Sequence, residues 1–175
     1  MDRLRLFLVA IFVSLGGLSL EGALIAMGIP LSLVPELVLI FVIFISFYET
    51  SAYGAFLAFL CGLMVDVSSG QLLGPWAGAY VLSFGAVSLI SDRIFVESGL
   101  SLLSVAIFMT LFSHAVFLLI AVDPISQLLS GWIVLVGKSL TTAFVAPLFF
   151  PLLRRVLWLS KSDAIRVGKR GRAYS

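Results

Sequence analysis

Four ionisable residues interrupt long apolar stretches of the sequence: Glu21, Asp66, His114 and Lys138. A charge at the centre of a bilayer costs about 2.5–3.5 kcal/mol on insertion scales, so each needs a partner or access to water. One interpretation is a polar cluster in which Lys138 neutralises Asp66 or Glu21. The other places both acids at the water interface, with the Lys138 ammonium extending toward it. Thr141 and Thr142 follow Lys138 at helical spacing and favour a polar helix face there.

His114 is the only histidine, so a histidine-based metal site would need carboxylates for its remaining ligands. Thr110 lies one helical turn earlier and favours a hydrogen-bonded packing role instead. Ser113 is adjacent to His114 and points to another side of a helix, and there is no nucleophile elbow, phosphate-binding loop or dinucleotide fingerprint. The single cysteine, Cys61, excludes an internal disulfide. We therefore predict a protein that is not an enzyme, with no catalytic, cofactor or metal site.

A second pattern consists of small residues and one acid at intervals of four. Its members are Gly54, Ala58, Gly62 and Asp66, and the spacing continues through Gly70, Gly74 and Gly78. Small residues at this interval let helix backbones approach closely, which favours helix packing in lipid. The pattern predicts either a packing seam inside the protein or a seam that receives the helix of a partner.

The elements that must position these residues follow from composition. The chain has 175 residues, 61% of them hydrophobic and 11% charged, with a mean hydropathy of +1.19. A soluble domain is about 25% charged, so this composition indicates an integral membrane protein. Apolar runs separated by turn residues predict six helices, over 5–27, 33–48, 52–68, 76–92, 98–121 and 128–158. We expect an all-α, polytopic bundle of six transmembrane helices, without room for a soluble catalytic domain.

Basic residues predict the orientation of this bundle. With six spans, ten of the eleven Lys and Arg residues lie on one side, and Lys138 lies within the last helix. The positive-inside rule then places both termini in the cytoplasm. Residues 1–160 form the predicted transmembrane domain, and residues 161–175 form a basic cytoplasmic tail near anionic lipid. Nucleic-acid binding by this tail is the less favoured alternative.

The last predicted helix is longer than a bilayer requires. About thirty residues would extend roughly 45 Å, whereas the apolar core of a bilayer is about 30 Å thick. Pro147 and Pro151 each remove a backbone donor and are expected to kink this helix. Its end, residues 151–160, combines two arginines with apolar residues and is expected to follow the inner interface.

The segment between the third and fourth predicted helices resembles a known family. The spacing Gly62-x-x-x-Asp66-x-x-Ser69-Gly70-x-x-x-Gly74 is similar to the signature of MreD, the rod shape-determining membrane proteins of bacteria. The opening Pro35-Glu36-Leu37 and the ending from Ala146-Pro147 to Arg154-Arg155 resemble that family as well. Glu21 is a departure, since related proteins often carry an uncharged amide there.

The resemblance implies a six-helix fold similar to the substrate-binding subunits of energy-coupling-factor transporters. It also implies a non-enzymatic scaffold in the bacterial inner membrane that supports rod shape and lateral peptidoglycan synthesis. The implied partner is MreC, a single-span protein, and through it MreB, RodA and a class B penicillin-binding protein. The Gly62, Asp66, Ser69, Gly70 and Gly74 motif would then be structural or partner-facing.

A small-molecule, vitamin-type binding subunit of a membrane transporter is the alternative function. Glu21, Asp66, His114 and Lys138 could line its pocket, although the expected outer loops are short. An intramembrane lipid-handling enzyme is a third reading, but the sequence shows no recognisable acid, base or metal set for it. Fold alone does not choose among these functions.

Overall fold

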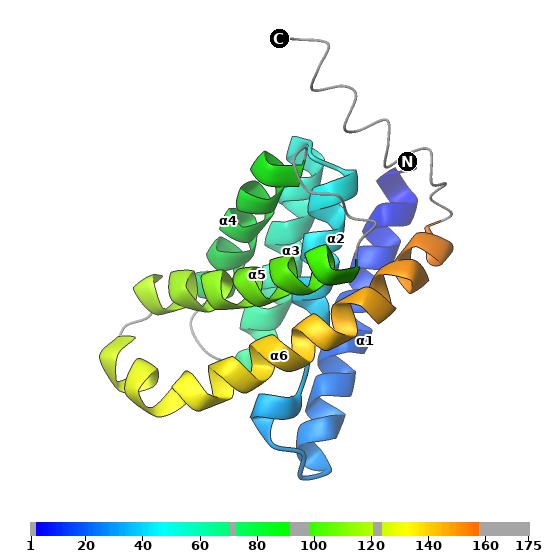
Figure 1. Ribbon diagram of the computed structural model, residues 1–175. Coiled ribbons are helices and arrows are strands. Elements are labelled where there is room, and N and C mark those ends of the chain that lie inside the picture. The colour runs from blue at the N-terminus through cyan, green and yellow to red at the C-terminus, as the bar shows by residue number, and fades with distance from the viewer. Residues whose placement is uncertain (1–2, 71–72, 92–98, 121–123, 158–175) are drawn as a thin grey trace.

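The computed structural model describes residues 3–70, 73–91, 99–120 and 124–157. Within these residues the chain forms six α-helices, one short 3-10 helix and no strands (Figure 1). The helices are α1 (Arg3–Ala26), α2 (Leu37–Tyr48), α3 (Ala52–Ser69), α4 (Pro75–Ile90), α5 (Gly99–Ile120) and α6 (Pro124–Val156), and the 3-10 helix η1 is Leu31–Leu33. The prediction of an all-α bundle of six helices is confirmed, and most of the predicted helix ends lie within two residues of the observed ones. The tail predicted at 161–175 lies outside the described residues.

The second predicted helix is divided in the structure. Residues 33–48 were expected to form one helix, but η1 ends at Leu33 and α2 begins at Leu37. The break precedes Pro35, whose ring disfavours helical backbone at the preceding residue. Val34 accordingly adopts an extended conformation, with φ −89° and ψ 115°. Because of this break, Glu36 is the residue that immediately precedes α2 rather than a residue inside a continuous helix.

Helix α2 lies at the centre of the bundle and contacts all five other α-helices. Every residue from Leu37 to Phe47 is buried. Its sequence is apolar on all sides, which is the pattern of a helix surrounded by other helices rather than one exposed on a single face. In Figure 1, α2, α3 and α4 stand beside one another, and α5 and α6 run across them.

Helix α6 has 33 residues, so it extends about 50 Å at 1.5 Å per residue. The chain stays helical through Pro147 and Pro151. It packs along α5 and also contacts η1 and α2. Gly137 permits the approach to η1, because a Cβ atom there would lie 2.6 Å from the Ser32 Cβ.

The outer surface of the bundle is suited to lipid. Large apolar side chains are exposed on every helix except the central α2, among them Phe12, Phe56, Leu89, Leu119 and Phe144. Five segments of the described chain are long and apolar enough to cross a membrane, and α4 is a shorter apolar helix of 16 residues. The chain is therefore a multi-pass membrane protein. Its orientation stays a prediction from the distribution of basic residues.

A buried polar cluster as the candidate functional site

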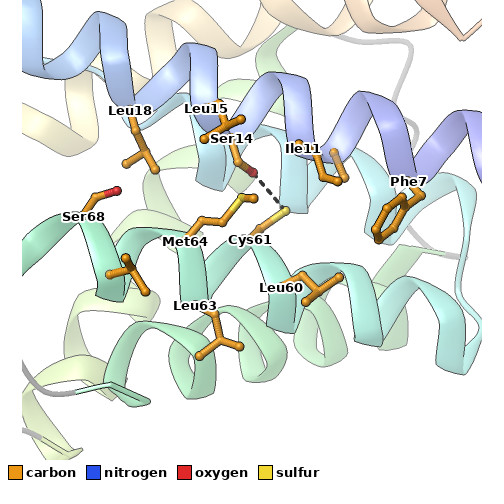
Figure 2. A pocket seen from close by; sticks show the side chains of 12 residues that line it. Phe7, Ile11, Ser14, Leu15, Leu18, Leu60, Cys61, Leu63, Met64 and Ser68 are labelled. Carbon is orange, nitrogen blue, oxygen red and sulfur yellow. Dashed lines mark hydrogen bonds between the residues drawn. The ribbon is translucent and has the colours of Figure 1, made fainter.

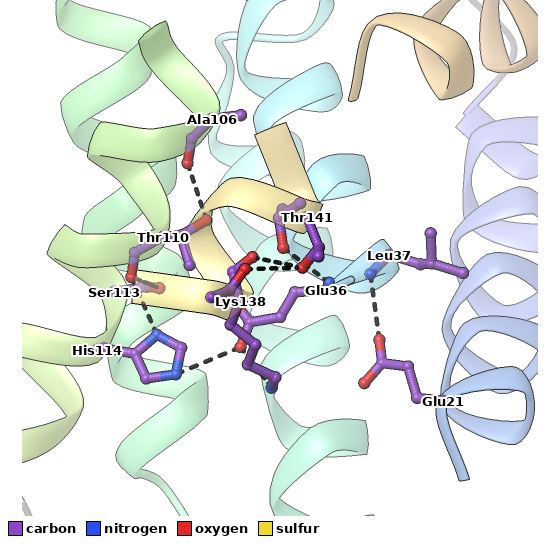
Figure 3. A network of polar contacts seen from close by, with 11 residues as sticks. Glu21, Glu36, Leu37, Ala106, Thr110, Ser113, His114, Lys138 and Thr141 are labelled. Carbon is purple, nitrogen blue, oxygen red and sulfur yellow. Dashed lines mark hydrogen bonds and ion pairs between the residues drawn. The ribbon is translucent and has the colours of Figure 1, made fainter. Parts of the chain in front are cut away.

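Three ionisable side chains from distant parts of the sequence meet inside the bundle (Figure 3). The Lys138 Nζ donates a hydrogen bond of 2.9 Å to Glu36 Oε1, and the His114 Nε2 lies 3.4 Å from the same oxygen. The Glu36 side chain is 5% exposed, whereas those of Lys138 and His114 are 14% and 18% exposed. We call Glu36, His114, Lys138 and the neighbouring Glu21 the polar cluster.

Backbone contacts hold the polar cluster in place. The Glu36 N–H donates to Thr142 Oγ1 on α6 at 3.0 Å, one turn after Lys138. The His114 Nδ1 lies 3.0 Å from the Thr110 carbonyl oxygen, and because a carbonyl only accepts, this nitrogen carries the proton. Trp76 of α4 packs edge-on against the imidazole, with 5.1 Å between ring centroids. Side chains from α5 and α6 therefore meet at the Glu36 carboxylate, and Trp76 of α4 packs against the histidine.

Glu21 joins the polar cluster from α1. Its Oε1 accepts a hydrogen bond of 3.1 Å from the Leu37 N–H, the first residue of α2. This contact satisfies one of the backbone donors that the start of a helix leaves without an intrahelical partner. Glu21 also lies within electrostatic range of Lys138 and Glu36. Glu21 therefore lies beside the start of α2, near Lys138 and Glu36. Lys138 forms its ion pair with Glu36, and not with Glu21 or Asp66 as expected.

Asp66 does not belong to the polar cluster. Its Oδ2 accepts from the N–H groups of Gly74 (2.9 Å) and Ala77 (3.1 Å), and its Oδ1 accepts from that of Trp76 (3.0 Å). The carboxylate is buried and caps the start of α4, where a negative charge is favourable. The expectation that Asp66 converges with Lys138 is wrong, because three backbone donors close by in the sequence occupy its oxygens.

The turn before α4 has the conformation that this cap requires. Gly70 and Gly74 have φ angles of 65° and 121°, which favour glycine. Ser69 Oγ donates to the Asp66 carbonyl oxygen at 2.8 Å and so stabilises the end of α3. The Asp66, Ser69, Gly70 and Gly74 part of the motif thus builds one tight connection between α3 and α4.

The rest of the small-residue pattern packs α3 against α4. A Cβ at Gly62 would lie 2.4 Å from the Ala77 Cα, and one at Gly54 would lie 2.7 Å from the Phe84 ring. Ala58 is fully buried. Gly78 faces α5 instead, where a Cβ added to it would lie 3.3 Å from the Ile120 Cδ1. The seam is therefore internal at Gly54 and Gly62. A partner helix cannot enter there without displacing α4.

Glu36 was not predicted from the sequence to be a charged residue within a membrane segment. Glu36 was assigned only to the opening of a helix, because it follows Pro35 and precedes the apolar run of α2. Residues 31–48 contain no other charged residue, and this was the signal that could have found it. Its partners lie 78 and 102 positions along the chain, so no local pattern links them.

The polar cluster has one unused acceptor. Glu36 Oε2 is buried and has no hydrogen-bond partner among the described residues. The described residues hold no group of three or more His, Cys, Asp or Glu side chains placed to bind a metal ion. Glu36 Oε2 is thus a buried acceptor for which the described residues supply no donor.

A second feature is a groove between α1 and α3 (Figure 2). Its volume is about 480 Å³, and apolar side chains such as Leu15, Leu18, Leu60 and Met64 line it. Ser14 and Cys61 lie at its base, where Ser14 Oγ donates to Cys61 Sγ at 3.4 Å. The groove offers an apolar surface without a charged group.

Comparison with known proteins gives one match. The family model described as rod shape-determining protein MreD matches residues 1–158. No curated protein and no solved structure matches the chain. The implied likeness to energy-coupling-factor subunits accordingly stays a prediction.

Proposed function

Because this chain belongs to the MreD family and so has a role in rod shape determination, we propose that it is a non-enzymatic scaffold of the bacterial cell-elongation machinery. In this role it binds MreC in the inner membrane and supports lateral peptidoglycan synthesis. MreB filaments, RodA and a class B penicillin-binding protein are reached through MreC. The single observation that carries the proposal is the family match over residues 1–158.

The architecture supports a scaffold whose contacts lie within the membrane. The described residues form helices joined by short connections, so the surfaces available to a partner are mainly helix faces. A single-span partner buries an apolar helix most readily against such a face. The seam at Gly54 and Gly62 is already filled by α4.

We place the MreC helix in the groove between α1 and α3. This groove is apolar and runs between two helices that are largely exposed, which suits an apolar helix of a partner. Val67, at one end, is 69% exposed and offers a position to obstruct the groove.

The test is co-purification of tagged protein with MreC in mild detergent from a rod-shaped host. We expect Val67→Trp to reduce MreC recovery about tenfold, which corresponds to about 1.4 kcal/mol. Leu119→Trp is the matched control, since Leu119 is exposed on α5 and does not line the groove. Equal recovery with both variants contradicts the groove as the contact, and absence of MreC from the wild-type preparation contradicts the scaffold function.

A small-molecule-binding subunit of a transporter is the second candidate function, and the polar cluster favours it. Glu36 Oε2 is an unused acceptor of the kind that fixes a ligand. Mass spectrometry of the same preparation separates the two functions. Stoichiometric recovery of an ATPase module in place of MreC supports the transporter subunit.

A further inference from the structure

The connection between α1 and α2, residues 27–36, is apolar, unlike the two connections that follow it. Between Glu21 and Glu36 the only polar side chain is that of Ser32. By contrast, residues 49–51 between α2 and α3 are Glu, Thr and Ser, and residues 68–71, where α3 ends, are Ser, Ser, Gly and Gln. A connection exposed to water is ordinarily polar, so the α1–α2 connection is suited to a different environment.

The apolar side chains of this connection point outward from the bundle. Met27 is 79% exposed, Leu31 47% and Leu33 56%. On its other side, η1 lies against α6, since a Cβ added to Gly137 would lie 2.6 Å from the Ser32 Cβ. In Figure 1, η1 lies beside the last turn of α1, at one end of the bundle. The connection therefore presents an apolar surface that the protein holds in place.

The backbone of the connection pairs most of its own hydrogen-bond donors. The N–H groups of residues 27–29 donate to carbonyl oxygens of residues 23–25, and those of residues 33 and 34 donate to the carbonyl oxygens of residues 30 and 31. Pro30 and Pro35 have no N–H group to pair. In hydrocarbon a backbone polar group finds no water, so it must be paired within the protein. This pairing makes the connection compatible with an environment of lipid.

Side chains of neighbouring helices continue the pairing at the start of α2. The Glu36 N–H donates to Thr142 Oγ1 at 3.0 Å, and the Leu37 N–H donates to Glu21 Oε1 at 3.1 Å. These N–H groups are among the donors that the start of a helix leaves without an intrahelical partner. Water serves such donors at a helix start on a wet surface, whereas α1 and α6 supply the acceptors here.

We propose that the α1–α2 connection lies within the bilayer, with Met27, Leu31 and Leu33 against the acyl chains just below the headgroups. The partner of this surface is the lipid itself. The surface continues the exposed apolar face of α1, on which Ile25 precedes Met27. The groove proposed for MreC is separate from it, because the α1 residues that line the groove end at Leu18. The test therefore does not depend on the proposed function.

The depth of the connection is measured by nitroxide labelling of the full-length protein in lipid nanodiscs. Cys61 is the only cysteine, so Leu31→Cys and Leu33→Cys are each made in a Cys61→Ala background. Power saturation compares collisions of the label with oxygen, which concentrates in lipid, and with a nickel chelate, which stays in water. The water control is Thr50→Cys, in the α2–α3 connection, and the lipid control is Phe144→Cys on α6, both at exposed positions.

We expect labels at Leu31 and Leu33 to collide with nickel several-fold less often than the label at Thr50, and to resemble the label at Phe144. Nickel collision rates equal to that at Thr50 would show that the connection lies in water, and the proposal would be wrong.

A substitution on the same surface gives a second measurement. Leu31→Gln introduces a polar side chain without adding a charge near the polar cluster. We expect it to lower the Tm in nanodiscs by about 2–4 °C, because a polar group is transferred into lipid. If the connection lay in water, this exposed substitution would leave the Tm unchanged, as is expected for the control Thr50→Gln. Equal Tm values for Leu31→Gln and the wild type contradict the proposal, and the labelling result holds even if Leu31→Gln fails to fold.

Discussion

Two buried carboxylates in this protein are satisfied in opposite ways. Asp66 receives three backbone N–H groups from residues 8 to 11 positions further along the chain. One oxygen of Glu36 contacts a lysine 102 positions away and a histidine 78 positions away. Its other oxygen has no hydrogen-bond partner among the described residues. The first carboxylate completes a local structure, while the second joins separate helices and keeps an acceptor free. Because Glu36 lacks a hydrogen-bond partner at one oxygen, the polar cluster is the candidate functional site. The motif around Asp66 is not, since both oxygens of that carboxylate have partners.

The largest effect is expected from Lys138→Met. This change leaves the buried Glu36 carboxylate without its cation, and breaking a buried ion pair costs about 3–5 kcal/mol. The free energy of unfolding of the purified protein, measured by denaturant titration in mixed micelles, checks the change. The double variant Glu36→Gln with Lys138→Met serves as the control and should recover most of the loss, because neither charge then remains. A double variant as unstable as the single one would mean that Lys138 acts by packing.

Asp66→Ala tests the local carboxylate and is expected to cost about 3 kcal/mol, from the loss of three hydrogen bonds at the start of α4. Asp66→Asn keeps one acceptor oxygen and should lose less than half of this. The amide hydrogen exchange of Gly74, Trp76 and Ala77 reports the effect directly. Exchange that rises throughout the bundle, rather than at the α3–α4 connection, would remove the distinction between the two carboxylates.

Gly62→Ala separates helix packing from the Asp66 cap and is expected to cost about 1–3 kcal/mol. The new Cβ would lie 2.4 Å from the Ala77 Cα and 2.7 Å from the Trp76 carbonyl oxygen, so α3 and α4 must move apart. Gly85→Ala is the matched control, since a Cβ there has no neighbour within 4 Å, and it should be neutral or slightly stabilising. The same micelle titration measures both variants. Equal stability of the two would show that the small-residue seam is not closely packed.

Much of the fold could be predicted from the sequence because its signals are local. Apolar runs gave the six helices, and the turn residues from Ser68 to Pro75 gave the α3–α4 connection. The break before α2 was missed, since the helical run was extended across Pro35 despite its effect on Val34. The polar cluster was predicted only in part. Lys138 and His114 do meet, but at Glu36, while Asp66 lies elsewhere.

The sequence by itself determined that this chain is an all-helical membrane protein, since each helix is specified by its own run of apolar residues. It also determined which residue types are costly to bury. The tertiary structure alone decided which charges meet and which small residues face α4. Those contacts join segments up to 102 positions apart, so they depend on how the helices pack around α2. A charge in an apolar environment must find a partner, but only the packing of distant helices selects it.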